Sequence, residues 1–386
     1  MDLRRHILAL VAPAGLGDEV VPGARLIGAS TELGPRLTFD VGGQDVHVEV
    51  EPISPTRPSA ARSARLMFSY RSGSGEIHVD PRLGQALCRA IAKIAGPQED
   101  RVLDALSRAA AEAAETRDGS TRIREVKVDR LLEPAGPRAR RYYTLSPYVG
   151  CLIGCRFCYA QSRVGIARDL ERLPVVPWGS YVDARVNAPE VLAKELAETA
   201  PRPLKFCPIV SDPYQAVEKR YGLTRACLEA IRDAPAAFPT LVLTRSRLVE
   251  RDAELIASLP DGRGGVSIPT IDDAVRQHFE PRGSSVDDRL SALRTLRAAG
   301  AKTFAVVQPL LPGSIPALAD ALAATVSSVS IDVLHGVEGA SDDFDDPAYA
   351  PSKESDWQIE RAVELEAALV ARGVSVWRGE LPPDLA

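Results

Sequence analysis

The sequence is short of the residues that would indicate a secreted disulfide scaffold or a membrane protein. Its 386 residues include six cysteines, which are too few for a disulfide framework at this length. No apolar run reaches the length that a membrane-spanning helix needs, so we expect no membrane partner. The apolar run at residues 7–12 is short and follows Asp2, so we expect a short helix or strand there rather than a signal peptide.

An excess of basic residues is also missing. The chain has 47 Lys and Arg residues against 52 Asp and Glu residues, which gives a formal net charge of −5. Tight, sequence-blind binding to DNA needs a basic surface, so this balance argues against it. Arginine-rich stretches occur at residues 57–65 and 138–141, and exposed loops commonly have this composition.

Three of the six cysteines form a compact motif. Cys151, Cys155 and Cys158 lie in the segment YVGCLIGCRFCY at residues 148–159. Three thiolates can hold three irons of a [4Fe–4S] cube and leave the fourth iron open to a ligand, which is a site for reaction rather than for electron transfer alone. A structural zinc loop or a disulfide are the alternatives. Zinc sites of that kind nearly always have four protein ligands, and no fourth Cys or His lies near this motif.

The CxxxCxxC spacing resembles the signature of the radical S-adenosylmethionine (SAM) superfamily. The resemblance implies that Cys151, Cys155 and Cys158 bind a [4Fe–4S] cluster and that SAM chelates the open iron. It further implies an enzyme in which one electron cleaves SAM to a 5′-deoxyadenosyl radical that abstracts hydrogen from a substrate. A flavodoxin or ferredoxin would supply the electron. Such a cluster needs a reducing compartment, so we expect a cytoplasmic protein.

Residues 1–125 are predicted to form a separate α+β accessory domain. Residues 37–41 and 46–50 flank the turn sequence GGQD, which indicates a β-hairpin. A second hairpin is predicted from residues 66–70 and 76–80, and two amphipathic helices follow it. We find no catalytic constellation here, and Cys88 is predicted to be a core residue.

Residues 126–350 alternate between strand and helix patterns. Six predicted strands, each followed by a helix or loop, indicate an α/β fold with a parallel sheet and helices outside it; the strands are residues 141–145, 204–210, 240–244, 265–270, 303–309 and 329–334. The number of strands fits a partial (β/α)6 barrel, the fold that the resemblance to radical SAM enzymes implies. The active site would then lie at the carboxyl ends of the strands. Residues 351–386 are predicted to add a closing helix and strand.

Several loop sequences resemble the spore photoproduct lyase-like branch of this superfamily, and together they cover about half of the chain. They are SPYVGC at residues 146–151, VNAPE at 186–190, SDPYQ at 211–215, TRS at 244–246, RD at 251–252, EPR at 280–282 and VQPLLPG at 307–313.

The resemblance assigns SAM contacts to residues at the ends of successive strands. Ser211 and Asp212 would accept hydrogen bonds from the SAM amino group, although Ser-Asp-Pro is also a good helix cap. Arg245 stands where the family usually has Lys, and its guanidinium would contact the SAM carboxylate. Ser267 matches a polar position near SAM, with an ordinary buried hydroxyl as the alternative.

Other residues are assigned to the adenine side of the pocket or to the reaction. Phe157 and Tyr159 would help to seat the adenine, and Gln308 would form part of its wall. Core packing or loop packing is the alternative for the aromatic residues.

Three further residues are candidates for a catalytic role. Cys207 is considered because the branch uses a cysteine hydrogen donor near this strand end, but it lies four residues before Ser211, so the register differs. Tyr214 and His335 are considered as pocket groups, with structural roles as the alternative.

Three functions follow from these patterns. The first is a radical SAM enzyme that acts on a small molecule or peptide in a tailoring pathway, which the acidic balance and the displaced cysteine favour. The second is repair of a cross-linked pyrimidine lesion in DNA, which a basic groove beside the barrel mouth would favour. The third is a non-catalytic iron–sulfur or zinc module in regulation. Fold and superfamily indicate the radical chemistry far better than they indicate the substrate.

Overall fold

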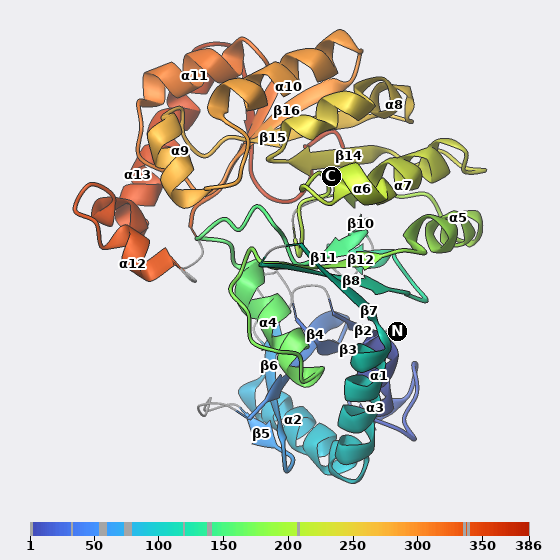
Figure 1. Ribbon diagram of the computed structural model, residues 1–386. Coiled ribbons are helices and arrows are strands. Elements are labelled where there is room, and N and C mark those ends of the chain that lie inside the picture. The colour runs from blue at the N-terminus through green and yellow to red at the C-terminus, as the bar shows by residue number, and fades with distance from the viewer. Residues whose placement is uncertain are drawn as a thin grey trace.

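The structure is a computed structural model that describes residues 3–31, 34–53, 60–72, 79–118, 120–136, 141–206, 209–334, 337 and 340–385. Figure 1 shows an N-terminal part, coloured blue to cyan, below a larger part that runs from green to red. Within the described ranges, no helix combines the length and the apolar character needed to cross a bilayer.

The N-terminal part is an antiparallel sheet covered by helices. Its strand order is β1-β2-β3-β4-β6-β5, and the predicted hairpin is present as β3 (Arg36–Val41) and β4 (Gln44–Pro52). Val46, Val48 and Val50 are all buried, as their alternation predicts. The remaining elements are β1 (Glu19–Val21), β2 (Ala24–Ser30), β5 (Ala61–Arg62), β6 (Leu66–Ser72) and the helices α1 (Leu3–Ala9), α2 (Pro81–Ala95) and α3 (Glu99–Glu112).

Helix α2 begins where its sequence signals predict a start. Asp80 is the N-cap, and its carboxylate accepts a hydrogen bond of 2.9 Å from the backbone N–H of Arg82. Cys88 is fully buried in the core that α2 shares with the sheet, as predicted. The partner strand predicted at residues 76–80 lies largely outside the described residues, and β6 pairs instead with β4 and β5.

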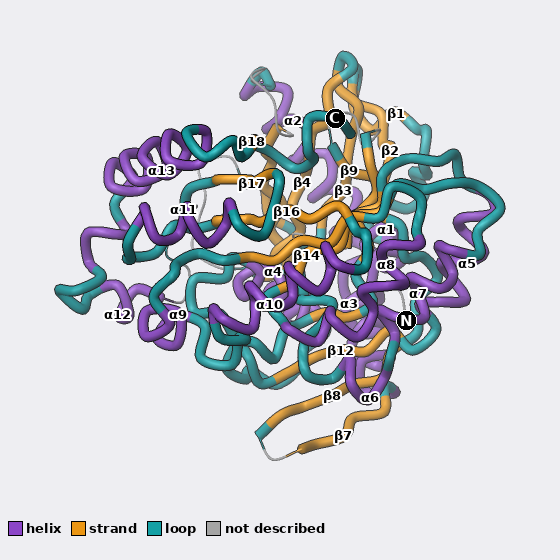
Figure 2. The backbone as a smooth tube through the Cα atoms, turned by 90° about the horizontal axis from the view of Figure 1, so that it is seen from above, coloured by secondary structure: helices purple, strands orange, loops and turns teal. Residues whose placement is uncertain are grey.

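A second sheet joins the N-terminal part to the barrel, and the sequence patterns do not predict it. Its order is β11-β12-β8-β7, formed by β7 (Ala114–Asp118), β8 (Thr121–Val126), β11 (Tyr148–Val149) and β12 (Tyr181–Arg185). Strands β8 and β12 pair in parallel from Arg122 with Tyr181 through Val126 with Arg185. Figure 2 shows the β7–β8 hairpin extending from the rest of the molecule. The predicted boundary at residue 125 therefore falls inside a strand of this sheet.

The larger part contains the predicted parallel sheet. Its order is β18-β17-β16-β15-β14-β13-β10-β9, in which all neighbours are parallel except the β9–β10 edge. The strands are β9 (Glu133–Ala135), β10 (Tyr142–Leu145), β13 (Leu204–Phe206), β14 (Thr240–Thr244), β15 (Arg263–Ser267), β16 (Lys302–Val307), β17 (Ser328–Ile331) and β18 (Ser375–Trp377). The six predicted strands follow one another in spatial order, and β18 adds the predicted closing strand.

Helices cover the outer face of this sheet (Figures 1 and 2). They are α5 (Ala188–Glu198), α7 (Leu223–Arg232), α8 (Ala253–Ser258), α10 (Val286–Ala298), α11 (Ile315–Ala323) and α13 (Ser355–Val370), while the short helix α6 (Glu218–Tyr221) precedes α7 and packs in a separate cluster with Tyr148. Their apolar faces and the strands form the largest hydrophobic core of the molecule. Sequential parallel strands joined by outer helices make the partial (β/α) barrel that the sequence predicts.

Helices inserted at the carboxyl ends of the strands were not predicted. Helices α9 (Asp273–Phe279) and α12 (Ser341–Phe344) both contribute aromatic side chains to a cluster that includes Cys151 and Cys155. Helix α4 (Ala160–Leu170) follows the cysteine motif directly. The inserted helices and α4 therefore surround the motif where barrel active sites lie.

Candidate active site

The cysteine motif forms a loop between β11 and α4. Cys151 and Cys155 are buried, and Cys158 is half-buried. The loop needs glycine at two positions, because Gly150 and Gly154 have φ values of +81° and +64°. A Cβ atom on Gly150 would lie 2.7 Å from the carbonyl oxygen of Tyr181, so the loop backbone lies directly against β12.

The three thiols lie close enough to influence one another. Burial raises the pKa of Cys151 to about 12, and Asp212 and Cys158 add to this shift. Burial also raises the pKa of Cys155 well above its ordinary value, with Arg245 opposing the shift and Cys158 and Cys151 adding to it. A thiol in this environment becomes a thiolate when a cation binds it, because the metal compensates for the lost hydration.

The three thiols do not converge on one point. Across the described part of the chain, no three His, Cys, Asp or Glu side chains converge closely enough to hold one metal ion. A cuboidal cluster holds its cysteine sulfurs on separate irons, so the sulfurs need not converge on one point.

One side of the cysteine loop is hydrogen-bonded to the segment that follows β13. The Ser211 hydroxyl donates to the Gly150 carbonyl oxygen at 2.8 Å, and the Gln215 amide donates to the same oxygen at 3.0 Å. The Gln215 side-chain oxygen in turn accepts from the Leu152 N–H at 2.7 Å. The predicted SAM segment is therefore fixed directly to the cysteine loop.

Asp212 connects this segment to the end of the next strand. Its carboxylate accepts hydrogen bonds from the Tyr214 N–H at 2.8 Å, the Thr244 hydroxyl at 2.6 Å and the Arg245 N–H at 2.8 Å. Burial raises the pKa of Asp212, and these three hydrogen bonds oppose the shift. Asp212 thus aligns the ends of β13 and β14.

Arg245 lies beside the cysteine loop and is already paired. Its guanidinium forms an ion pair with Glu280 and donates to the Gln308 carbonyl oxygen at 3.2 Å. Its Cζ atom lies 5.4 Å from the centre of the Phe157 ring. Burial disfavours its charge, but Glu280 and then Cys155 outweigh burial and raise the pKa of Arg245.

Glu280 is the centre of this charge network. It is fully buried, it forms an ion pair of 2.7 Å with the equally buried Arg289, and its carboxylate accepts from the Cys155 thiol at 3.8 Å. Burial alone would raise its pKa, but Arg289 and Arg245 hold the pKa of Glu280 below its ordinary value. Two arginines share one carboxylate, which leaves a net positive environment beside Cys155.

Ser267 provides a direct test of whether the site fits a bound group. Its side chain is 1% exposed at the end of β15, and its hydroxyl has no hydrogen-bond partner among the described residues. A buried hydroxyl without a partner carries a desolvation cost, which a ligand with a polar group would remove. The three adjacent thiols fit an iron–sulfur cluster, and the unpartnered hydroxyl fits a polar group of a nucleotide ligand.

The residues predicted for the adenine side surround the same loop. Phe157 is buried against Phe279 of α9, with ring centres 6.2 Å apart. Tyr159 is half-buried and is the N-cap residue of α4. The Gln308 amide donates to Asp332 at 3.1 Å, directly before a cis peptide to Pro309.

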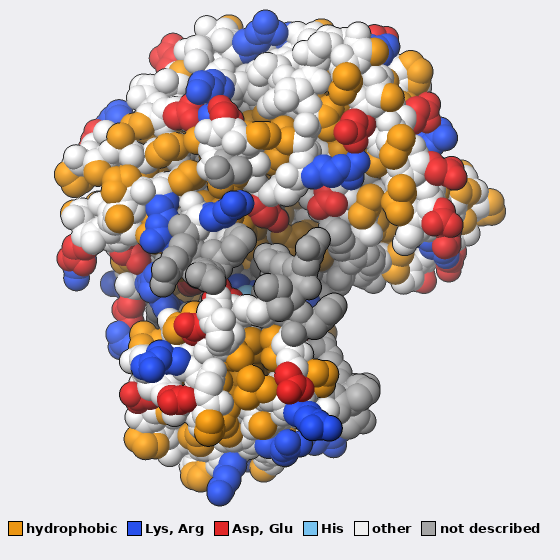
Figure 3. Space-filling view, turned by 180° about the vertical axis from the view of Figure 1, so that it is seen from behind, with side chains coloured by type: hydrophobic (Ala, Val, Ile, Leu, Met, Phe, Trp, Pro, Cys, Tyr) orange, Lys and Arg blue, Asp and Glu red, His pale blue; other side chains and the backbone are white. Residues whose placement is uncertain are grey.

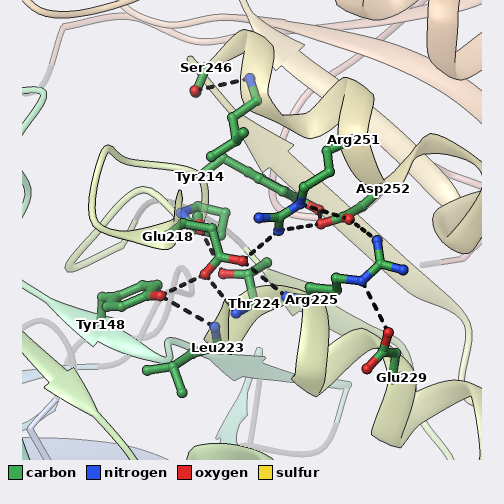
Figure 4. Close-up of polar contacts among 12 residues, drawn as sticks. Tyr148, Tyr214, Glu218, Leu223, Thr224, Arg225, Glu229, Ser246, Arg251 and Asp252 are labelled. Carbon is green, nitrogen blue, oxygen red and sulfur yellow. Dashed lines mark hydrogen bonds and ion pairs between the residues drawn. The ribbon is translucent and has the colours of Figure 1, made fainter. Parts of the chain in front are cut away.

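A buried polar network lies behind the Ser211 segment and is drawn in Figure 4. The fully buried Glu218 accepts hydrogen bonds from the Tyr148 hydroxyl at 2.6 Å, the Thr224 N–H at 2.9 Å and Arg251 at 2.6 Å. Tyr148 belongs to β11, so the network ties the strand that leads into the cysteine loop to α6 and α7.

Tyr214 belongs to the same network. Its hydroxyl donates to Asp252 at 3.1 Å, and Asp252 also accepts from Arg225 at 2.6 Å (Figure 4). Tyr214 is fully buried in the main core. Its surroundings are those of a positioning group.

Two candidates, Cys207 and His335, lie outside the described residues. The structure brings together the three cysteines, Ser211, Asp212, Arg245, Ser267, Phe157 and Gln308 around one loop and the adjoining strand ends. The sequence reasoning left the roles of Glu280 and Gln215 open. The EPR and SDPYQ segments contain them, but their pairing with Arg245 and the cysteine loop depends on tertiary contacts.

A family model and several curated relatives match this chain. Residues 145–325 match the model described as the Radical SAM superfamily. An uncharacterized protein of Methanocaldococcus jannaschii is 29% identical over 194 residues, which are 50% of this chain and 69% of that protein. A protein of Pseudomonas phage M6 named radical SAM Nalpha-GlyT isomerase is 24% identical over 192 residues, which are 48% of this chain and 38% of the phage protein. The chain spans about half the length of further curated relatives that it matches.

Solved structures include one of a spore photoproduct lyase variant with a dinucleoside spore photoproduct. It aligns with a TM-score of 0.48 and 19% sequence identity, and the alignment covers 67% of this chain and 81% of that chain.

Proposed function

We propose that this chain is a radical SAM enzyme that uses a [4Fe–4S] cluster and SAM, and that its substrate is a small molecule or a peptide. When bound and reduced, these cofactors supply a 5′-deoxyadenosyl radical that abstracts a hydrogen atom, while the protein provides binding and orientation.

We assign the cluster to Cys151, Cys155 and Cys158, whose thiols are adjacent in the buried loop. The polar side of the SAM site is assigned to Ser211, Asp212, Arg245 and Ser267, of which Ser267 has a hydroxyl free to bond to a ligand.

Phe157, Tyr159 and Gln308 are assigned to the adenine side. Cys207 and His335 remain candidates for a catalytic role. Tyr214 is assigned a positioning role, because its hydroxyl is already bonded to Asp252.

The observation that carries the substrate proposal is the pairing of four arginines near the cysteine loop with carboxylates. Each of these arginines forms an ion pair with at least one carboxylate. The pairs are Arg156 with Asp343, Arg163 with Glu49 at 3.1 Å, Arg172 with Asp104 at 3.0 Å, Arg124 with Asp183 at 2.5 Å and Arg124 with Glu171 at 2.9 Å. An arginine that is already neutralised by a carboxylate gains little from a phosphate. This arrangement favours a substrate without a phosphodiester backbone.

The rest of the surface supports the same proposal. On the face drawn in Figure 3, basic and acidic side chains are interspersed rather than gathered into one basic stripe. Arg282 is an exposed exception beside the cysteine loop, since its guanidinium packs against Gly154 and Gly179 and has no carboxylate partner among the described residues. One exposed cation does not make a groove for nucleic acid.

The cofactor assignment is tested by anaerobic reconstitution with iron, sulfide, SAM and dithionite. The wild-type chain should form 5′-deoxyadenosine, and the Cys151→Ala variant should lose both the iron–sulfur absorption and this product. Cys227→Ala is the matched control, because Cys227 is a buried core residue of α7, away from the cluster loop. A Cys151→Ala variant that still makes 5′-deoxyadenosine would contradict the cluster assignment.

The substrate class is tested by hydrogen transfer. Deuterated small molecules and peptides are incubated with the reconstituted enzyme, and deuterium is sought in 5′-deoxyadenosine. A parallel reaction contains a dinucleotide with a cross-linked pyrimidine lesion. Turnover of the dinucleotide, with no transfer from small molecules or peptides, would favour DNA repair and reject the proposal.

A further inference from the structure

A cavity of about 390 Å³ lies beside the cysteine loop, between α4 and the segment that leads into β12. This volume is within the range of small-ligand sites. Its lining combines apolar, aromatic and charged side chains: Gln161, Ser162, Arg168, Asp169, Val175 and Trp178, with Tyr181 at its inner end.

Only one layer of aromatic side chains separates this cavity from the cysteine loop. The Tyr181 ring lies within contact of the ideal Cβ position of Gly150, the residue before Cys151. Trp178 packs against the apolar cluster that contains the motif cysteines, and it meets the Tyr181 ring edge-on at 5.9 Å between ring centres. Trp178 and Tyr181 also pack with Val210, directly before Ser211. The cavity therefore adjoins both the cluster loop and the predicted SAM segment.

Arg168 is a buried cation in this cavity, and no carboxylate among the described residues lies within ion-pair distance of it. Its side chain donates to the Pro174 carbonyl oxygen at 3.1 Å, and its Cζ atom lies 4.0 Å above the Tyr181 ring. No carboxylate in the described part of the chain forms an ion pair with it. The neighbouring Arg124 shows the usual arrangement, because it is equally buried and pairs with two carboxylates. Asp183 and Glu171 act on Arg168 only from beyond ion-pair distance, and burial outweighs their effect and lowers the pKa of Arg168.

A second donor in the cavity lacks an acceptor. The indole N–H of Trp178 is shielded from solvent and has no hydrogen-bond partner among the described residues. A buried N–H group of this kind calls for an acceptor from outside the chain. Arg168 and Trp178 both flank the Tyr181 ring and line the same cavity.

We propose that this cavity binds the carboxylate group of a small organic substrate, with Arg168 as its counter-ion and the Trp178 N–H as a second donor. The proposal rests on the proposed function and narrows its substrate class to carboxylic acids. A planar carboxylate matches the donor fork of a guanidinium. Asp169 also lines the cavity and repels a doubly charged phosphate more strongly than a singly charged carboxylate, while Val176 suits an apolar remainder.

The test measures binding of simple probes to the reconstituted, unreduced protein with saturating SAM present. Phenylacetate is the probe, phenylacetamide is its neutral counterpart, and phenyl phosphate is the doubly charged one. Ligand-detected NMR titrations should show phenylacetate binding at least tenfold more tightly than either of the others. Arg168→Gln should weaken phenylacetate binding at least tenfold, and Arg168→Lys should weaken it less.

Arg172→Gln is the matched control, because Arg172 lies just beyond the same helix but pairs with Asp104 at the surface. It should bind phenylacetate like the wild-type protein. Trp178→Phe keeps the ring and removes the N–H, and it should weaken binding severalfold. Thermal unfolding of each variant shows that it is folded; removal of the unpaired charge in Arg168→Gln should not lower the melting temperature.

The proposal is overturned if wild-type protein does not bind phenylacetate, if the amide binds as tightly, or if Arg168→Gln has no effect. Binding of phenylacetate only when SAM is left out of the titration would assign the site to the cofactor and overturn the proposal as well. These titrations need no reduction, so they separate the two proposals: binding of phenylacetate without 5′-deoxyadenosine formation in the reductive assay would reject the proposed function alone.

Discussion

The Glu280 carboxylate lies 3.8 Å from the sulfur of Cys155, although the two residues are 125 positions apart in the chain. Glu280 follows α9, and its other contacts are Arg245 after β14 and Arg289 in α10. Ion pairs beside Cys155 therefore connect the loop after β14 with the loop after α9 and with α10. The cysteine loop is held by contacts with the barrel as well as by its own local sequence.

Because the Ser267 hydroxyl has no partner among the described residues, its removal should weaken SAM binding without lowering the stability of the protein. Ser267→Ala removes a buried hydroxyl without a partner, so the free energy of unfolding should stay unchanged or rise by up to about 1 kcal/mol. The dissociation constant for SAM should rise by about threefold to tenfold, which equilibrium dialysis measures.

Ser211→Ala is the matched control for this pair of measurements. The Ser211 hydroxyl donates to Gly150, so its loss should lower the free energy of unfolding by about 1 kcal/mol. A large loss of stability in Ser267→Ala would mean that its hydroxyl has a protein partner.

The buried network around Glu218 predicts that replacing its carboxylate by an amide lowers the stability of the protein strongly. Glu218→Gln should lower the free energy of unfolding by about 2 to 3 kcal/mol, measured by urea unfolding, because it leaves the Arg251 charge less well compensated. The cost stays below that of a fully buried pair, since Arg251 is partly exposed and keeps Asp252 as a partner.

Glu229→Gln provides the comparison within Figure 4. Glu229 pairs with Arg225 at 3.1 Å on the surface of α7, and such exposed pairs contribute little. Its loss should change stability by less than about 0.5 kcal/mol. Equal effects of the two substitutions would show that the buried network does not stabilise the fold.

The backbone of the cysteine loop predicts a specific intolerance. Gly150→Ala should lower stability by about 1 to 3 kcal/mol and reduce the iron content after reconstitution, because its φ is +81° and its Cβ would meet the Tyr181 carbonyl. Gly165→Ala, in α4, should instead raise stability by up to about 1 kcal/mol, since no atom crowds its Cβ position. Full iron incorporation in Gly150→Ala would contradict the loop geometry.

His47 predicts how the stability of the N-terminal part depends on pH. Burial, followed by the charges of Arg36 and Arg71, lowers the pKa of His47 from 6.5 to about 3. The unfolded chain therefore binds a proton that the folded chain does not bind between these two pH values. This contribution to stability is complete above pH 6.5 and is lost as the pH falls, by up to about 1.4 kcal/mol per pH unit.

The measurement is urea unfolding of wild-type protein and His47→Gln at several pH values from 7 to 5. The variant should lose about 1 to 2 kcal/mol less than the wild-type protein over this range. If the free energy of unfolding changes equally with pH in the two proteins, the fold does not keep His47 neutral.

Local patterns predict much of this architecture. The alternation of Val46, Val48 and Val50 and the six buried strand segments identify the sheets, because burial on one or both faces leaves a periodic record in the chain. The order of the parallel strands follows from the rule that sequential strands usually lie side by side.

Pairings between distant segments leave no such record. The ladder of β8 with β12 joins residues almost sixty positions apart, and short polar strands such as Thr121–Val126 give a weak pattern. Cysteine spacing predicts the cluster loop because three ligands lie within eight residues of sequence. The partners of Arg245 and the cavity beside α4 depend on tertiary packing, so they emerge only from the structure.

The β8–β12 ladder has a practical consequence for dissecting this protein. A fragment that begins after Val126 would lose β8 and leave one edge of β12 with unpaired backbone groups beside Tyr181. Exposed strand edges recruit other chains, so such a fragment should self-associate. The strand that pairs with this edge is β8, which belongs to the N-terminal part. The two parts are therefore poor candidates for separate expression.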